Sequence, residues 1–346
     1  MSRRYLGVVI IVFVAACFQQ RPVTAQLVVP GMGTQIHYVG DDFEDPDWRF
    51  IDRLPKSSRE NDGYARSPLG YAANRRWAEG PERGHPDRLE IIPTPADGLP
   101  GSEHSLLMQT RNSGVPGRNS FDVQQDDLIV NCQGRIGSSI RVSEMPNCLV
   151  RVFLPPPEQW EDRSGPHFGF RSGLSSAGNT TGRGFFGSLA GNVAEPYWPG
   201  IWIHFRSETS RRVEQDSAFL KVRGDRSGRD FRVLEIEEFG WWTLGMSFTG
   251  DGKVHFFASP GVDPLTEADH LTSQYPYSFQ AARFRTFFFN ACNRNDGKTW
   301  STPFVLDDPQ LFVVNAERVA SLVERKERAR ARAAAAKAKT GTTKTR

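Results

Sequence analysis

The chain has 346 residues, of which 24% are charged and 11% aromatic. Its formal net charge of +3 is uneven: residues 315–346 carry ten Lys or Arg and three Asp or Glu, whereas residues 26–314 carry 30 basic and 37 acidic residues. This acidic body excludes a uniformly basic nucleic-acid binder, and no nucleic-acid partner is expected.

The N-terminus has the pattern of a secretory signal. The basic Ser2-Arg3-Arg4 precedes an apolar run from Leu6 to Cys17, which is shorter than the roughly 20 residues of a membrane span. Removal of residues 1–25 is predicted to leave a secreted, periplasmic or cell-envelope protein without a transmembrane span. Alternatively, Val14-Ala15-Ala16-Cys17 resembles a bacterial lipobox, which would make the protein a lipoprotein anchored through Cys17.

Residues 41–314 follow a linker of residues 26–40 and are predicted to form one all-β domain. Apolar runs of strand length recur along them, and Gly, Pro, Asn and Asp punctuate the gaps. No helical period of comparable length interrupts these runs, which favours a β-sandwich of the jelly-roll type with long loops. The runs are Ser105 to Thr110, Leu128 to Asn131, Ser139 to Val142, Leu149 to Leu154, His167 to Arg171, Ile201 to Arg206, Ala218 to Arg223, Phe231 to Ile236, Phe284 to Ala291 and Pro303 to Val314.

Residues 45–104 are rich in Pro, Gly and charge, yet they carry Trp48, Tyr64, Tyr71 and Trp77. Disordered linkers seldom carry so many aromatic residues. We expect this segment, here called the excursion, to be ordered and to run over the sandwich.

The runs His167 to Arg171 and Ile201 to Arg206 each predict a strand with one apolar and one polar face. Alternate residues of a strand point to opposite sides, so the aromatic and hydrogen-bonding residues of these two runs would share a face. Such a surface suits sugars, because aromatic rings stack on their C–H faces and polar groups bind their hydroxyls. The predicted ligand-binding residues are His167, Arg171, Trp202, His204 and Arg206. Alternatively, the excursion covers this face and the polar groups are interior.

The stretch from Gly240 to Gly261 predicts a hairpin. Its two apolar strands flank a turn in which Asp251-Gly252 tolerates the positive φ of a tight reversal. From Trp242 to Phe248, large apolar residues alternate with small ones, which is the period of a strand with one buried face. The side chains of Trp241 and Trp242 are therefore predicted to point to opposite faces of the strand, one toward the core and one toward a groove.

Three segments together resemble the concanavalin A-like lectin/glucanase sandwiches, and more closely a group of uncharacterised secreted bacterial proteins of that type. They are Asp41-Asp42-Phe43-Glu44-Asp45, the Trp241-Trp242 strand with its Asp251-Gly252 turn, and Phe304-Val305-Leu306-Asp307-Asp308. The resemblance covers roughly residues 38–314. This fold hosts lectins, glycoside hydrolases, polysaccharide lyases and adhesion domains.

The resemblance implies that the first and last strands lie side by side, where acidic residues hold a structural calcium ion. The candidate ligands are Asp42, Glu44, Asp307 and Asp308. Carboxylate oxygens suit a hard cation. Alternatively, these carboxylates cap strand ends and face water.

Cys132, Cys148 and Cys292 follow the predicted signal. Cys132 and Cys148 lie near the ends of two predicted strands, so an oxidising compartment would allow a disulfide between them. The alternative is three buried thiols. The chain has no CxxC motif and no Cys/His cluster that would indicate zinc.

No intact catalytic motif is present, so the sequence leans against an enzyme. Glucanases of this fold carry Glu-x-Asp-x-x-Glu, and retaining hydrolysis needs two carboxylates. The nearest match, residues 234–239, leaves Glu235 and Glu237 as catalytic candidates on a shared face, or as solvent-facing residues. Lyase-like Arg206-Ser207-Glu208 and Gln35-Ile36-His37 occur in the wrong order, and a third lyase motif is absent.

Residues 315–346 form a tail rich in Ala, Arg and Lys. Val319, Leu322 and Val323 make an apolar stripe at helical spacing, which predicts a helix that frays into a disordered end. The tail is either solvated or contacts an anionic envelope surface or acidic glycan.

These observations predict a secreted, lectin-like protein that binds a polysaccharide or other glycan. One alternative is a glycoside hydrolase or polysaccharide lyase on the same fold. Another is a structural or adhesive component of the cell envelope.

Overall fold

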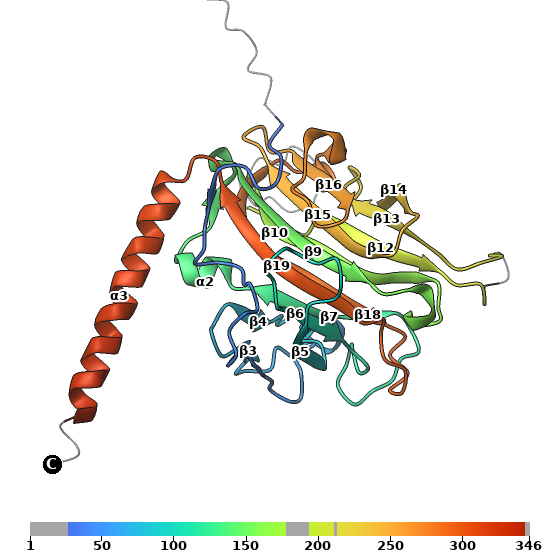
Figure 1. The fold of residues 1–346 in the computed structure, drawn as a ribbon, viewed down its shortest axis with the longest axis horizontal. Coiled ribbons are helices and arrows are strands. Elements are labelled where there is room, and N and C mark those ends of the chain that lie inside the picture. Colours follow the sequence, from blue (N-terminus) through green and yellow to red (C-terminus); the bar gives the residue numbers. More distant parts are fainter. Residues whose placement is uncertain (1–26, 178–193, 211–212, 343–346) are drawn as a thin grey trace, which may run out of the picture.

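The computed structural model describes residues 27–177, 194–210 and 213–342. Within them, two antiparallel sheets stack as a sandwich, and a long C-terminal helix projects from one end (Figure 1). The predicted all-β sandwich with a basic helical tail is confirmed. The predicted signal segment, residues 1–25 with Cys17, lies outside the described residues.

The first sheet, sheet A, has the order β17-β16-β15-β9-β19-β6-β5, and β1 also pairs with β19. That pairing sets residues 34–35 of the predicted linker beside the last strand, whereas the acidic segment 41–45, expected to be the opening strand, forms no strand. The bounds are β1 (Thr34–Gln35), β5 (Arg88–Pro93), β6 (His104–Gln109), β9 (Pro146–Leu154), β15 (Gly240–Phe248), β16 (Val254–Pro260), β17 (His270–Gln274) and β19 (Phe304–Val313).

The second sheet, sheet B, has the order β14-β13-β12-β10-β18-β7-β4-β3-β2, while β11 pairs with β10 and β8 with β18. Its strands are β2 (Phe50–Ile51), β3 (Tyr71–Ala72), β4 (Trp77–Glu79), β7 (Gln124–Val130), β8 (Ile140–Arg141), β10 (Gly165–Ser176), β11 (Pro196–Tyr197), β12 (Gly200–Arg206), β13 (Ser217–Arg223), β14 (Asp230–Ile236) and β18 (Ala281–Asn293). The helices are α1 (Arg59–Asp62), α2 (Cys132–Ile136) and α3 (Glu317–Thr342), with 3-10 turns η1 (Val142–Glu144), η2 (Pro157–Gln159), η3 (Glu267–Asp269) and η4 (Pro276–Ser278).

The predicted hairpin is formed by β15 and β16, paired from Trp242↔Pro260 to Phe248↔Val254. Trp242 lies in the core between the sheets, as the alternation predicts. Trp241 lies on the opposite face of sheet A, where its Nε1 donates to the Ala96 carbonyl at 3.0 Å. Trp241 is only 5% exposed, so the expectation that it faces a groove is wrong.

Aromatic rings fill much of the space between the sheets. Phe168 and Phe170 of β10 stack on Phe289 of β18, with ring centroids 5.9 and 5.5 Å apart. Large apolar side chains at alternate positions of paired strands supply most of the favourable burial of such a core. The core therefore fixes which residues of sheet B point outward.

The excursion is ordered, and it builds the edges of both sheets as well as the loops over them. Its β2, β3 and β4 extend sheet B, and its β5 closes sheet A. A buried lysine fastens it: Lys56 Nζ lies 2.7 Å from Asp126 Oδ2 on β7 and 2.8 Å from Asp87 Oδ1. The same ammonium donates to the Asn112 carbonyl at 2.9 Å, so all its protons have acceptors.

Helix α3 packs on the sandwich only at its start. Val319 is buried in the core, and Arg318 forms a two-armed ion pair with Glu144 at 2.6 Å. Beyond Val323 the described side chains are exposed. No helix in the described part of the chain is long and apolar enough to cross a bilayer.

The three described cysteines are free, buried thiols, so the predicted Cys132–Cys148 disulfide is not formed. Cys132 opens α2 beside sheet B, whereas Cys148 lies in β9 of sheet A opposite Met246. Burial raises the pKa of the Cys132 thiol to about 12, which leaves it protonated and unreactive at neutral pH.

We predict that Lys56→Met destabilises the domain by about 3 kcal/mol at neutral pH, because it leaves the buried Asp126 without its cation. Urea unfolding at pH 7.5 checks this. Asp126→Asn in the Lys56→Met background should recover part of the loss, since the unpaired charge is then gone. Lys298→Met, at an exposed lysine, is the matched control, and equal midpoints for the two lysine variants would refute the anchoring role.

Candidate functional site

The outer face of sheet B carries the polar residues of β12. Ile201, Ile203 and Phe205 lie in the core, so Trp202 and His204 point to the opposite face. The alternation predicted for this strand is confirmed. Trp202 is nevertheless only 3% exposed, which makes it a supporting rather than a contacting side chain.

A cavity of about 490 Å³ opens on this face. Its walls come from five parts of the chain: the excursion, β7, β10 with the loop before β12, β13 and β18 with η4. Residues of the excursion form one wall of this cavity, and Arg171 is the one predicted ligand-binding residue that lines it. Trp202 and His204 are buried, so neither alternative given by the sequence holds for the whole face. The lining residues are Glu60, Glu82, Arg83, Gln125, Asp127, Arg171, Trp198, Arg223, Tyr277 and Phe288.

Arg171 is the central cation of this cavity. Its side chain is 7% exposed, and its hydrogen bonds go to the carbonyl of Trp198, at 3.0 Å from Nη2. No carboxylate of the described residues forms an ion pair with it. Burial, together with the charge of the neighbouring Arg223, lowers the pKa of Arg171 to about 10. A buried guanidinium without a carboxylate partner favours an incoming acceptor.

Trp202 supports both arginines. Its ring lies 5.2 Å from the Arg171 guanidinium and 5.4 Å from that of Arg223, and such contacts fix a cation's position. A side chain at Gly169 would approach the Trp202 ring to 2.8 Å, so this glycine lets the indole lie flat on β10. Arg223 is held from its other side by Asp230 at 2.8 Å.

Asp127 of β7 supplies the buried carboxylate of the cavity. Its Oδ1 accepts hydrogen bonds from Asn290 Nδ2 at 2.5 Å and from Gln125 Nε2 at 3.2 Å. Burial raises the pKa of Asp127 above its ordinary value, while the charge of Arg171 opposes the rise. The lining of the cavity offers donors from Arg171 and Gln125 and acceptors from Asp127 and Glu82.

A second cavity of about 470 Å³ adjoins the first and shares Glu82 and Trp198 with it. It runs over β4, β7 and α2, and its walls include Ile129, Leu174 and Pro196. Trp198 is 43% exposed at the junction. We call the two joined cavities the sheet B cleft.

His167 does not lie on the outer face, so its predicted grouping with Arg171 is wrong. A β-bulge between Pro166 and Phe168 inserts one residue opposite β12, and one extra residue turns a side chain to the other face. The ring of His167 lies 5.7 Å from that of Phe205, in the core.

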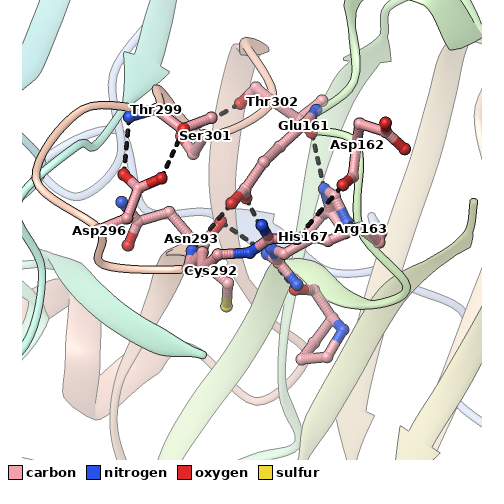
Figure 2. Close-up of polar contacts among 12 residues, drawn as sticks. Glu161, Asp162, Arg163, His167, Cys292, Asn293, Asp296, Thr299, Ser301 and Thr302 are labelled. Atoms are coloured by element: carbon pink, nitrogen blue, oxygen red, sulfur yellow. Dashed lines mark hydrogen bonds and ion pairs between the residues drawn. The ribbon is translucent and has the colours of Figure 1, made fainter. Parts of the chain in front are cut away.

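The interior position of His167 satisfies both ring nitrogens (Figure 2). Nε2 donates to the Arg163 carbonyl at 3.0 Å, and Nδ1 accepts from the Thr302 hydroxyl at 2.7 Å. Beside it, Arg163 pairs with the buried Glu161 at 2.6 Å. Burial lowers the pKa of His167 well below its ordinary value, which identifies a neutral, structural imidazole.

The other predicted residues lie at the β14 edge of the outer face. His204 stacks on Phe219 at 5.4 Å, and burial lowers its pKa to about 4. Arg206 pairs with Glu235 at 2.9 Å, and Arg232 contacts the same carboxylate. Glu237 lies one residue beyond the end of β14, so the shared face of Glu235 and Glu237 stays a prediction.

The predicted calcium ligands gather but do not converge. Glu44 Oε1 accepts from the backbone of Glu103 and His104 at 2.9 and 3.0 Å, and Asp308 pairs with Arg151 at 3.3 Å. Among the described residues, ligand atoms within 4.8 Å of one another belong to Glu44, Glu103 and His104. Of the four predicted calcium ligands, only Glu44 belongs to that group. Asp42, Asp307 and Asp308 lie outside it, so the four predicted ligands do not fit a shared calcium ion.

Most lining residues of the sheet B cleft were not anticipated from the sequence. Gln125 and Asp127 alternate along β7 with Asp126 and Leu128. This period of two is the sequence pattern that could have placed Gln125 and Asp127 on one face of the strand. Trp198 and Tyr277 lie in or beside short loops, where no period exists to place them.

No family model matches the sequence, and no curated protein is similar to it. Among solved structures, the alginate lyase AlyC3 bound to dimannuronate is 8% identical, with a TM-score of 0.34 over 61% of this chain and 74% of that chain. The GH43 protein BlXynB from Bacillus licheniformis is 12% identical, with a TM-score of 0.37 over 69% of this chain and 37% of that chain. A legume lectin-like domain from Entamoeba histolytica is 10% identical, with a TM-score of 0.31 over 69% of this chain and 90% of that domain. Likenesses this remote do not transfer an activity.

We predict that Asp307→Asn stabilises the protein at pH 8 but not at pH 4. Burial, with the nearby charges of Asp308 and Glu44, raises the pKa of Asp307 to about 7. The folded state therefore holds a proton that the unfolded state loses near pH 4, so this group's contribution to stability falls between about pH 4 and pH 7. A melting midpoint at least about 3 °C higher at pH 8 is expected. Asp47→Asn, at an exposed site, is the control, and equal shifts at both pH values would contradict the assignment.

Proposed function

We propose that the sheet B cleft binds a saccharide chain, and that the protein is a secreted or cell-envelope carbohydrate-binding protein. The observation that carries this proposal is Arg171, a buried guanidinium that faces the cavity. It interacts with the charge of Asp127 but forms no ion pair with a carboxylate of the described residues. Around it lie acceptors from Asp127 and Glu82 and donors from Arg223 and Gln125. Sugar hydroxyls both donate and accept, so they fit such a mixed lining.

Trp198 supports the choice of a saccharide. Its indole is 43% exposed between the two cavities, where an aromatic face can stack on the C–H face of a pyranose. An extended cleft with an aromatic ring at its midpoint suits several linked sugars better than one compact ligand. We therefore propose that Trp198, and not Trp202, stacks on the sugar, while the Trp202 ring supports Arg171 and Arg223.

Hydrolysis or elimination of the bound chain is a second candidate function, favoured by Asp127. A carboxyl whose pKa is raised by burial is suited to act as a general acid. Incubation with polysaccharides, followed by assays for new reducing ends and for unsaturated products, tests this function. Products that vanish in Asp127→Asn would establish it, whereas binding without products would leave a lectin-like protein.

The basic part of α3 is proposed to contact an anionic envelope surface. Beyond Val323 it carries exposed cations, among them Arg325, Lys326 and Arg328, while the body is acidic. Retention of the chain in an envelope fraction should fall after charge-neutral substitution of these arginines and lysines, and unchanged retention would remove this role.

We predict that Arg171→Gln and Trp198→Ala each weaken saccharide binding about 5- to 150-fold, since each removes a contact worth about 1–3 kcal/mol. A glycan array identifies the ligand, and calorimetry measures the affinity. Arg206→Gln is the matched control, because Arg206 already pairs with Glu235 and is not part of the cleft lining. Failure to bind any glycan on the array, or equal losses in all three variants, would overturn the proposal.

A further inference from the structure

Two loops form a single tip at one end of the sandwich. Residues 111–123 lead into β7, and residues 294–301 follow β18; Figure 1 shows loops projecting beyond these strand ends. Ser120 N donates to the Asn295 carbonyl at 3.2 Å, and Asn295 Nδ2 donates to the Arg118 carbonyl at 3.2 Å. Because Asn295 is 2% exposed, it holds the loops together from within.

This tip presents apolar side chains to solvent. Phe121 is 69% exposed, Val123 45% and Trp300 38%. These are three of the seven large hydrophobic residues exposed in the described chain. Scattered exposed residues are ordinary, but these three lie on two loops that hydrogen bonds join, and exposed apolar residues on one end of a molecule suit an interaction surface.

The backbone of Phe121 adopts a left-handed conformation, which is unfavourable for a bulky side chain. Phe121 has φ of 59° and Asn295 has φ of 50°. Asparagine adopts this left-handed region with little strain, whereas a bulky aromatic residue rarely does. Backbone conformations of this kind recur at binding segments.

The tip is also positively charged. Its cations are Arg111, Arg118, Arg294 and Lys298, against the acidic Asp122 and Asp296. Asp296 is used inside its loop, where it accepts from the backbone of Thr299 and Lys298 at 2.7 and 2.9 Å. The Arg111 guanidinium lies 4.9 Å over the Trp300 ring, so cations border the apolar residues.

We propose that this tip docks on an anionic phospholipid bilayer, with Phe121, Val123 and Trp300 entering the interface and the flanking cations meeting lipid phosphates. Aromatic residues favour the bilayer interface, where their rings are partly buried. Basic residues near an anionic leaflet are attracted to its lipid phosphates. Two joined loops that carry exposed aromatic residues and four cations offer groups for both the acyl chains and the phosphates of such a surface.

The test measures insertion at Trp300 directly, with the full chain and vesicles of phosphatidylglycerol and phosphatidylcholine that carry brominated acyl chains. Bromine quenches an indole that enters the bilayer. Trp300 and Trp198 are the two exposed tryptophans of the described chain, and α3 contains no aromatic residue. Quenching should therefore disappear in Trp300→Phe and persist in Trp198→Phe.

A second measurement separates insertion from attraction by α3. Phe121→Ser should weaken vesicle binding about tenfold, because the variant no longer buries an aromatic side chain in the bilayer interface. Leu54→Ser, at a residue 72% exposed on the excursion, should leave binding unchanged. Unaltered quenching in Trp300→Phe, or equal affinities of Phe121→Ser and wild type, would overturn the proposal. Binding lost only on neutralising α3 would overturn it as well.

Discussion

The buried ion pair between Lys56 and Asp126 is the contact on which the candidate site depends. It ties the excursion to β7 at a point where neither charge reaches water. Adjacent residues of a strand point to opposite sides, so Asp126 receives this anchor on one face while Asp127 enters the sheet B cleft on the other. Asp126 therefore anchors the excursion that forms one wall of the cleft, and the adjacent Asp127 lines the cleft itself.

Further buried carboxylates replace the sheet hydrogen bonds that the excursion lacks. Asp41 Oδ2 accepts from the indole nitrogens of Trp77 and Trp48 at 2.8 and 3.0 Å. Glu79 accepts from the backbone of Ser57 and Gly70, both at 2.7 Å. A segment with few strands must satisfy its buried N–H groups through side chains. This explains how a Gly- and Pro-rich segment forms a rigid wall, which places Glu82 in the cleft.

The sequence predicted which residues of a regular strand share a face. It did not predict the position of a β-bulge or the order of the strands in sheet B. Alternation correctly divided β12 and β15 into two faces, because a strand's period is fixed by its backbone. It failed at His167, where a bulge adds one residue that no composition signals. The cleft itself unites residues as distant as Glu60 and Phe288, and only the strand order of sheet B brings these together.

The two proposed surfaces are mechanically linked because they occupy one pair of strands. Gln124 of β7 pairs with Asn293 of β18 beside the tip, and Ile129 pairs with Phe288 at the cleft. Five residues of strand separate these pairs, which is about 16 Å at 3.3 Å per residue. A hydrogen-bonded strand pair in a packed sheet bends little over that length, so docking of the tip on a bilayer would hold the cleft at a fixed height. A saccharide carried on that surface would then meet Arg171 in one orientation, and lipid binding at the tip would select its ligands by their distance from the membrane.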